Sequence, residues 1–154
     1  MIRLVKDNKL FNLRHKIINI LMNSGKKNIG EKILLKSFKS LQRSSTRRAL
    51  TVFCMSVVNS TSAFKINEQA TKKGKRKAVK IVPSFVINDS LRIANTLKSI
   101  KRISTKSRGS HPFYQSFLVE LLSISDSKSK VIEQKIKIQR QILTNKRYLT
   151  KFRW

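Results

Sequence analysis

The residues that could perform catalysis are few in this sequence. Its 154 residues include two histidines, His15 and His111, and seven aspartates and glutamates scattered along the chain. Enzyme chemistry needs acids, bases or nucleophiles that converge at one place. Glu31 follows Asn28 at the spacing of a helix capping pair, and Asp89 stands where a helix is expected to begin. We therefore expect no catalytic residue and no enzyme activity.

Phosphate-binding loops and metal sites are not predicted either. The stretch Gly25-Lys26-Lys27 resembles the end of such a loop, but the first glycine and the preceding strand are missing. The one cysteine, Cys54, excludes an internal disulfide and paired zinc ligands, and its apolar helical stripe predicts a core residue. We expect no cofactor, no metal and no small-molecule substrate.

Positive charge is the chemistry that the sequence does supply. Lysine and arginine number 35 against seven acids, which gives a formal net charge of +28. Such a chain repels itself unless a polyanion neutralises it. Apolar runs fall far short of the roughly eighteen residues of a membrane span. A peripheral membrane protein would need one helix with a wide exposed apolar face, whereas the stripes here look matched for packing on one another, so we expect no membrane partner. A nucleic acid is the favoured polyanion, and cations on every predicted element favour a large folded RNA over a duplex held by one helix.

One stretch, residues 62–86, reads as a two-stranded β-ribbon. Apolar residues alternate with polar ones along both of its arms, at the period of a strand. These alternating residues are Phe64, Ile66, Val79 and Ile81. Between the arms, residues 72–77 contain five cations and a glycine that eases a turn. The sequence predicts a ribbon with a cationic tip, whose base must be braced by helices.

Helical periodicity covers the rest of the chain. The predicted helices span about residues 10–22, 28–43, 46–58, 88–103, 110–125 and 130–145. Thr46 and Ser110 are the expected N-caps of the third and fifth helices, and residues 104–110 are expected to form a basic loop. A basic arm at residues 1–9 and a basic, aromatic tail at residues 146–154 complete one domain, residues 1–154. The predicted fold class is mainly α, a six-helix bundle-like domain with a two-stranded β-ribbon inserted between helices three and four.

Apolar stripes mark the faces that we expect to be buried. On the second helix the stripe is Ile29, Ile33, Leu34, Phe38 and Leu41. On the third it is Leu50, Phe53, Cys54, Val57 and Val58. On the fourth it is Leu91, Ala94, Leu97 and Ile100, while Lys98, Lys101 and Arg102 are expected to point outward.

The first predicted helix carries a recognisable signature. The segment Lys16–Lys27 resembles the K-F-V-N-x-L-M-x-x-G-K-K helix of small-subunit ribosomal protein seven, the bacterial S-seven family. Asp7 and Lys9 look like the D-P-K-F that leads into it, one residue shorter. The next helix follows at once, as it does in that family.

Weaker matches continue in the same order along the chain. Val82-Pro83 with Phe85-Val86 is similar to the V-P-V-E-V of the family's second ribbon strand. The segment Phe117–Leu122 resembles its L-A-N-E-L helix, with Glu120 on the glutamate, and Phe152-Arg153-Trp154 looks like its terminal Y-R-W. The chain is thereby similar to the family over nearly its whole length.

This resemblance implies a structural constituent of the small ribosomal subunit that binds the three-prime major domain of small-subunit rRNA and organises assembly of the head. It implies a ribbon near the exit-site tRNA and the mRNA path, and other head and platform ribosomal proteins as partners. The RNA-binding residues it implies lie in the arm, the first turn, the ribbon, the loop before the fifth helix and the tail. They are Arg3, Lys6, Lys9, Lys26, Lys27, Lys65, Lys72, Lys73, Lys75, Arg76, Lys77, Lys80, Lys106, Arg108, Arg147, Lys151, Arg153 and Trp154.

Departures from the family pattern point to an organelle. The arginine-glycine-glycine of the family's ribbon turn is replaced by Lys75-Arg76-Lys77, and its fourth-helix Arg-Trp pair falls near Ala94-Asn95. Drift of this size is typical of a mitochondrial ribosome. Because the match begins near Asp7, we expect no cleaved presequence and synthesis inside the organelle.

A basic DNA-binding or nucleoid protein is the alternative, because that class needs only charge and helices. Neither a zinc-finger nor an RRM signature is present, and a homeodomain-like arrangement does not account for six helices and a ribbon.

Overall fold

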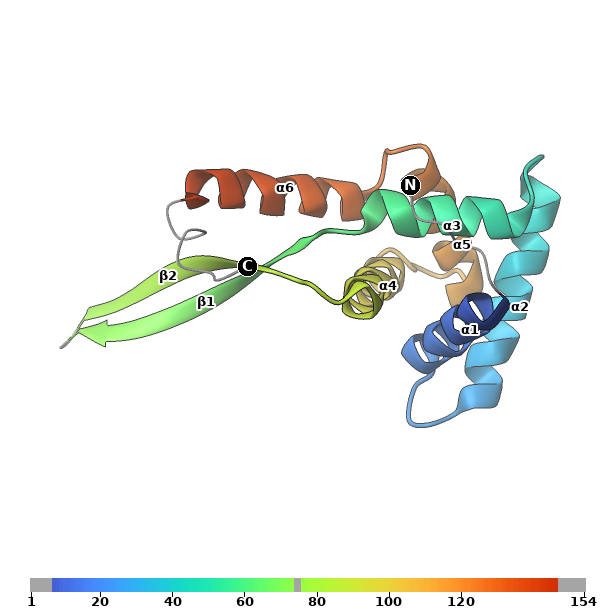
Figure 1. The fold of residues 1–154 in the computed structure, drawn as a ribbon. Helices are drawn as coiled ribbons and strands as arrows, with labels where there is room; N and C mark the ends of the chain where they lie inside the picture. Colours follow the sequence, from blue (N-terminus) through green and yellow to red (C-terminus); the bar gives the residue numbers. More distant parts are fainter. Residues whose placement is uncertain (1–6, 74–75, 147–154) are drawn as a thin grey trace.

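The protein is a helical body from which a β-ribbon projects (Figure 1). The structure, a computed structural model, describes residues 7–73 and 76–146, with side chains at residues 13–67 and 81–146. Three helices, two strands and three further helices follow one another along these residues. This order confirms the predicted mainly α fold with a two-stranded ribbon between the third and fourth helices.

The first three helices are α1 (Asp7–Leu21), α2 (Lys27–Ser44) and α3 (Ala49–Ser60). Helix α1 begins earlier than predicted, so residues 7–9 of the expected arm are helical; an aspartate at the first position suits the positive end of the helix dipole. Gly25 has a φ of 75° in the turn between α1 and α2, the left-handed conformation that glycine commonly adopts just after the C-terminus of a helix.

The ribbon consists of β1 (Phe64–Lys73) and β2 (Arg76–Phe85), which pair in antiparallel orientation. Phe64 lies opposite Phe85, and their rings meet edge to face with centroids 5.5 Å apart. Phe64 is half-buried and Lys65 is exposed, as the alternating pattern predicts. The ribbon therefore carries an apolar contact at its base, next to the helices that brace it.

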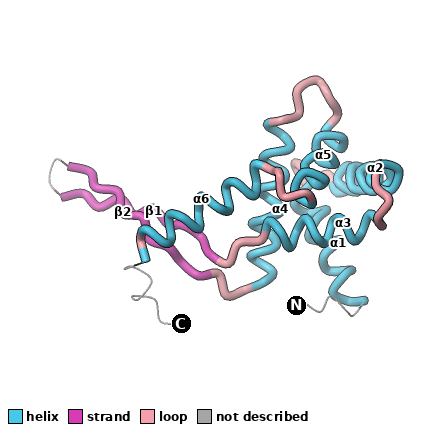
Figure 2. Tube along the Cα trace, turned by 90° about the horizontal axis from the view of Figure 1, so that it is seen from above, coloured by secondary structure: helices cyan, strands magenta, loops and turns pink. Residues whose placement is uncertain are grey.

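The last three helices are α4 (Asp89–Lys106), α5 (Phe113–Ser125) and α6 (Lys130–Thr144). Helix α4 begins where predicted, because the Asn88 side chain accepts a hydrogen bond from the Ser90 amide at 2.9 Å. Figures 1 and 2 show α6 alongside the base of the ribbon, where it contacts β1. Helix α4 starts directly after the ribbon and packs on α5 and α1.

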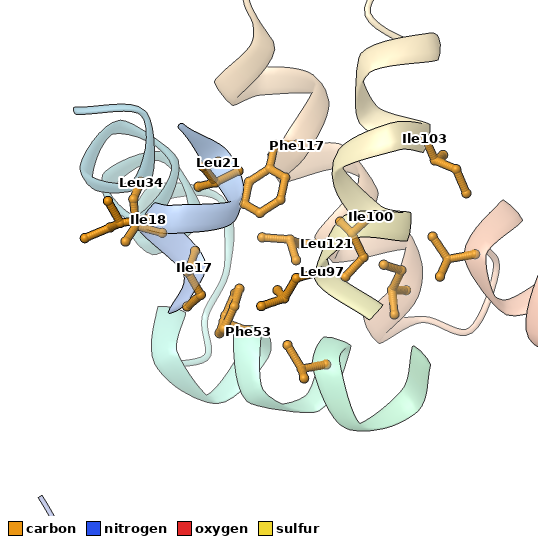
Figure 3. Packing of buried hydrophobic residues seen from close by; sticks show 13 residues of the cluster. Ile17, Ile18, Leu21, Leu34, Phe53, Leu97, Ile100, Ile103, Phe117 and Leu121 are labelled. Atoms are coloured by element: carbon orange, nitrogen blue, oxygen red, sulfur yellow. The ribbon is translucent and has the colours of Figure 1, made fainter. Parts of the chain in front are cut away.

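The core of the body draws on all six helices (Figure 3). Phe53, Ile100, Phe117, Leu121 and Ile124 are almost completely buried at its centre. Burial of each such side chain is worth about 1.5–3 kcal/mol relative to exposure. This continuous core holds α4 and α6 at the base of the ribbon.

Helix α3 buries Phe53 and Val57 of the predicted stripe, but its buried face is turned away from the other stripe residues. Leu50 and Val58 are about half exposed, while Ser56 is fully buried. The Ser56 hydroxyl lies 2.7 Å from the main-chain oxygen of Val52 and 2.8 Å from that of Leu121. A small side chain at this position lets α3 approach α5 closely, and a search for large apolar residues does not find such a face.

Two other predicted core positions are also exposed. Ile29 on α2 is 52% exposed and Leu91 on α4 is 50% exposed, because both lie in the first turn of their helices, at the margin of the body. None of the helices within residues 7–73 and 76–146 has both the length and the apolar character that crossing a bilayer requires.

A glycine sets the spacing between α1 and α2. Gly30 is buried, and a Cβ added there would lie 3.2 Å from the Ile18 carbonyl oxygen and 3.3 Å from the Met22 amide nitrogen. These neighbours are backbone atoms, which cannot swing aside as a flexible side chain can. The absence of a Cβ is therefore what allows the two helices to pack this closely.

The predicted cap of α2 is wrong. Its N-cap is Lys26, without a side-chain hydrogen bond, because the chain turns tightly at Gly25 and the helix starts before Asn28. Glu31 instead forms an ion pair with Arg14 of α1, at 2.5 Å.

The caps predicted for α3 and α5 are wrong as well. The N-cap positions are Arg48 and Pro112, not Thr46 and Ser110, and neither makes a side-chain cap bond. The predicted basic loop is shorter, because α4 continues to Lys106, where Ser104 is fully buried against the body. Tertiary packing extends α4 beyond the point at which its local pattern weakens.

Candidate nucleic-acid interface

Most described cations have no acidic partner. Two ion pairs occur among the described side chains, Arg14 with Glu31 and Arg92 with Asp89. A protein with this excess of positive charge repels itself in solution. An external polyanion would offset this charge through the cations that are not engaged within the fold.

Several cations are used inside the fold. Lys101 Nζ lies 2.8 Å from the Ile20 carbonyl oxygen and 2.8 Å from Asn23 Oδ1, so it binds the end of α1 and does not point outward as predicted. Lys135 Nζ donates to the Asn59 carbonyl oxygen at 2.7 Å, and burial lowers the pKa of Lys135.

Arg92 is held in a similar way beside the ribbon. Its Nε donates to the Val86 carbonyl oxygen at 2.5 Å, and its guanidinium lies 4.8 Å from the centroid of the Phe85 ring. Lys16 donates to the side chain of Ser90 at the start of α4. These cations stabilise the joints between helices and ribbon, so they are poor candidates for phosphate binding.

A groove opens where the base of the ribbon meets α4 and α6. Its volume is about 400 Å³, and the described side chains that line it include four cations and no acid. The four cations are Lys65, Arg92, Lys98 and Lys135. Of these, Lys65 and Lys98 are exposed and make no side-chain hydrogen bond or ion pair with another described residue. They are the two cations of the groove that are free to bind a ligand.

Free cations continue from this groove along one face of α4, which we call the α4 track: Lys98, Arg102 and Lys106. Their spacing of four residues places them on the same side of the helix, over roughly 12 Å of its length. All three are exposed and line a hollow of about 560 Å³ against Asn19 and Ile20 of α1. Parallel free cations along a hollow suit the phosphate backbone of a nucleic acid.

The turn between α1 and α2 adds charge beside this track. Lys26 and Lys27, both predicted as RNA-binding, are exposed there. Asn23, just before them, accepts the hydrogen bond from Lys101, so the turn lies next to α4. Arg108 is exposed in the loop after α4, where its Nε donates to the His111 carbonyl oxygen at 3.0 Å. Lys106 and Arg108 thus extend the track toward α5.

The ribbon brings like charges together near its tip. The register places Lys72 opposite Lys77, and Lys73 opposite Arg76. Like charges at directly opposed positions destabilise an isolated antiparallel pair. A bound polyanion would relieve this repulsion.

The remaining predicted site residues are not placed by the structure. Six belong to described strands or to α1, but only their backbone is described; they are Lys9, Lys72, Lys73, Arg76, Lys77 and Lys80. Seven lie outside the described residues: Arg3, Lys6, Lys75, Arg147, Lys151, Arg153 and Trp154.

Candidate catalytic groups do not converge in the described residues. No group of three or more His, Cys, Asp or Glu side chains there could hold a metal ion. The carboxylate of Glu120 is nearly buried and accepts a hydrogen bond from the Ser129 hydroxyl. Cys54 is half-buried, and burial raises the pKa of its thiol, which disfavours the reactive thiolate.

Sequence reasoning missed Lys98 and Arg102 as binding candidates. The signal was present, because Lys98 and Arg102 are four residues apart in a predicted helix and therefore share one of its faces. Lys101 stands among them in the sequence, however, and only its contact with α1 separates it from the free cations.

A helical body with a projecting ribbon and free cations along a groove defines a class of small basic proteins suited to packing against a polyanion. The family model described as ribosomal protein S7p/S5e matches residues 3–146, and the chain belongs to that family. It is also similar to the small ribosomal subunit protein uS7c of Euglena longa, with 22% identity over 154 residues, which cover 97% of this chain and 84% of the relative.

Family membership makes this chain a structural protein of the small ribosomal subunit and not an enzyme. It also implies small-subunit rRNA and other ribosomal proteins as partners. The resemblance seen in the sequence is thereby confirmed at the level of the family.

Proposed function

We propose that the protein binds the three-prime major domain of small-subunit rRNA through the α4 track and the ribbon, and so organises assembly of the subunit head. The observation that carries this proposal is the set of free cations that runs from Lys65 on the ribbon through Lys98, Arg102 and Lys106 on α4. Lys98 lines both the groove beside Lys65 and the hollow beside Arg102 and Lys106, whereas the neighbouring Lys101 and Lys135 are engaged within the fold.

The shape of this surface favours folded RNA over duplex DNA. A DNA-reading helix must project into the major groove, roughly 12 Å wide. Here α4 is packed against α1 and α5, and its free cations flank a hollow against α1. Contacts distributed over a ribbon, a helix and a turn match a folded RNA that presents phosphates in several directions.

Binding measured against salt tests this proposal. We expect the full-length protein to bind a transcript of the three-prime major domain more tightly than duplex DNA of equal length. Replacement of Lys98, Arg102 and Lys106 by Gln should reduce the slope of log affinity against log salt by about 0.7–0.9 for each phosphate that the variant no longer binds.

The matched control removes the same charge from the exposed face of α2, at Lys32, Lys39 and Arg43. This control should change the slope much less. Equal affinity for RNA and for duplex DNA would instead favour the DNA-binding or nucleoid alternative, and equal reductions in both variants would count against the α4 track.

The ribbon has a second role in the proposal. Its projection away from the helical body (Figure 1) suits an arm that reaches the exit-site tRNA and the mRNA path. Cross-linking from the strand positions nearest the tip in translating ribosomes tests this role. Adducts with tRNA or mRNA are expected, and adducts confined to rRNA would restrict the ribbon to subunit assembly.

We place the protein in an organellar ribosome and favour the mitochondrion. The sequence departs widely from the bacterial pattern, and the relative in Euglena longa is a chloroplast-type form. Mass spectrometry of small subunits purified separately from mitochondria and plastids distinguishes the two compartments. Peptides of this chain in plastid subunits alone would move the assignment to the plastid.

A further inference from the structure

The groove between the ribbon, α4 and α6 is lined by apolar and amide side chains as well as cations, and phosphate binding alone does not need them. We propose that it receives one unstacked RNA nucleotide, whose base inserts between α4 and α6 while its flanking phosphates meet Lys65 and Lys98. This inference deepens the proposed function, on which it rests, by naming the class of ligand for one part of the interface. The volume of the groove, about 400 Å³, falls within the usual range of about 300–1,000 Å³ for sites that enclose a small molecule.

Part of the surface of the groove is apolar. Phe64 and Ile66 of β1 and Ile138 of α6 are half-buried there, and Val86 and Val131 are buried. Phosphates gain nothing from such a surface, whereas the faces of an unstacked base do, because aromatic and apolar contacts replace the stacking that the base had in the RNA. The lining therefore fits a base better than a continuous backbone.

Two amide side chains face the groove from opposite walls. Asn95 of α4 is half-buried and Gln134 of α6 is exposed, and neither makes a side-chain hydrogen bond with another described residue. An amide offers both a donor and an acceptor, the combination that reads the edge of a base. Their placement on two helices supplies polar groups on both sides of an inserted base.

The four cations of the groove fall into two pairs, one engaged within the fold and one free to bind phosphate. Arg92 and Lys135 are engaged by the Val86 and Asn59 carbonyl oxygens, so they support the walls. Lys65 and Lys98 are free, one on the ribbon and one on α4, and none of the described side chains that line the groove is acidic. Phosphates on either side of the inserted nucleotide would therefore meet one cation on each rim.

Chemical footprinting of a complex tests the inference. The full-length protein is bound to a transcript of the three-prime major domain, and the RNA is probed with dimethyl sulfate, which modifies the pairing edges of unpaired adenine and cytosine. We expect protection of an unpaired base that Gln134→Leu or Asn95→Leu removes, with affinity lowered by about tenfold in each variant and the salt slope unchanged. Gln139→Leu, an exposed glutamine of α6 that does not line the groove, is the matched control.

This experiment distinguishes failure of the inserted-base proposal from failure of the proposed rRNA interface. Unchanged protection and affinity within about twofold in the Gln134→Leu variant would overturn the inserted base, and because Gln134 is exposed, this result does not depend on Asn95→Leu folding correctly. Lys65→Gln with Lys98→Gln should reduce the salt slope. If that double variant also binds as the unaltered protein does, the proposed rRNA interface itself is wrong at this site.

Discussion

Lys101 Nζ lies 2.8 Å from the main-chain oxygen of Ile20, so a side chain of α4 closes the C-terminal end of α1. A cation at this end interacts favourably with the helix dipole and satisfies carbonyl groups that have no partner within the helix. We predict that Lys101→Met lowers the free energy of unfolding by about 1–3 kcal/mol and leaves the salt slope of RNA binding unchanged. Chemical denaturation and salt titration measure the two effects.

The matched control is Lys98→Met, one turn earlier on α4. It should have the opposite profile, with little change in stability and a smaller salt slope. Similar profiles for the two variants would refute the division between structural and RNA-binding cations.

A second prediction concerns the pH dependence of stability at Lys135. Burial lowers the pKa of this lysine below its unfolded value, so between the two pKa values the unfolded state binds more protons and stability rises with pH. The unaltered protein should therefore gain stability relative to Lys135→Gln as the pH is raised from 7 toward the ordinary lysine pKa of about 10.4. Denaturant titrations of both proteins across this range measure the difference, and a constant difference would show that burial does not perturb the lysine.

Gly30 gives a prediction that runs against helix propensity. Alanine is normally more stable than glycine in a helix by about 1 kcal/mol. Gly30→Ala should instead destabilise the protein by about 1–3 kcal/mol, because the new Cβ presses on backbone atoms of Ile18 and Met22. Lys32→Ala, exposed on the same helix, should be nearly neutral in the same thermal unfolding measurement. A stabilised Gly30→Ala variant would mean that α1 and α2 can separate at no cost in stability.

The Ser129 hydroxyl links two helices. It accepts a hydrogen bond from the Val131 amide as the N-cap of α6 and donates to the nearly buried carboxylate of Glu120 on α5. Ser129→Ala should cost about 1–2 kcal/mol of stability. A double-mutant cycle with Glu120→Gln should show a coupling energy of at least about 0.5 kcal/mol, because the two side chains are in direct contact. Additive effects would show that the cap acts without the carboxylate.

The cations near the tip of the ribbon should destabilise the free protein and strengthen its binding to RNA. Replacement of Lys72, Lys73, Lys75, Arg76 and Lys77 by Ala removes like charges from opposed positions, which favours strand pairing in the free protein. The same change should weaken rRNA binding at moderate salt, and with it subunit assembly or retention of exit-site tRNA. Sedimentation of reconstituted subunits and tRNA retention assays measure these effects, and normal values in both would show that the tip makes no functional contact.

Much of the fold follows from local patterns in the chain. The helical stripes and the alternation beginning at Phe64 predict six helices and one ribbon, because hydrophobic periodicity reports which face of an element is buried. The caps at Thr46 and Ser110 were predicted wrongly, since packing of whole helices outweighs the roughly 1 kcal/mol of a cap. The face of α3 was predicted correctly at Phe53 and Val57 and wrongly at Leu50 and Val58, because Ser56, a small polar residue, lies at a close helix contact.

The sequence predicted a cationic surface for RNA binding, but it identified only some of the residues that form the candidate site. Lys26, Lys27, Lys65, Lys106 and Arg108 are exposed, so they remain candidates. Lys98 and Arg102 join them only because α4 packs with this face toward the hollow beside α1. The groove could not have been foreseen, since one of its walls comes from α6, which is far from the ribbon and α4 in the sequence.

By itself, the sequence determined the excess of positive charge, the succession of elements and the likeness to one ribosomal family. These properties depend on composition and on local sequence patterns, which are the same in the unfolded chain as in the folded protein. The tertiary structure alone decided which cations are available for binding. Lys101 meets Ile20 across 81 residues of sequence and is engaged, while Lys98, on the same helix, is left free. Availability depends on contacts between distant segments, and no local pattern contains that information.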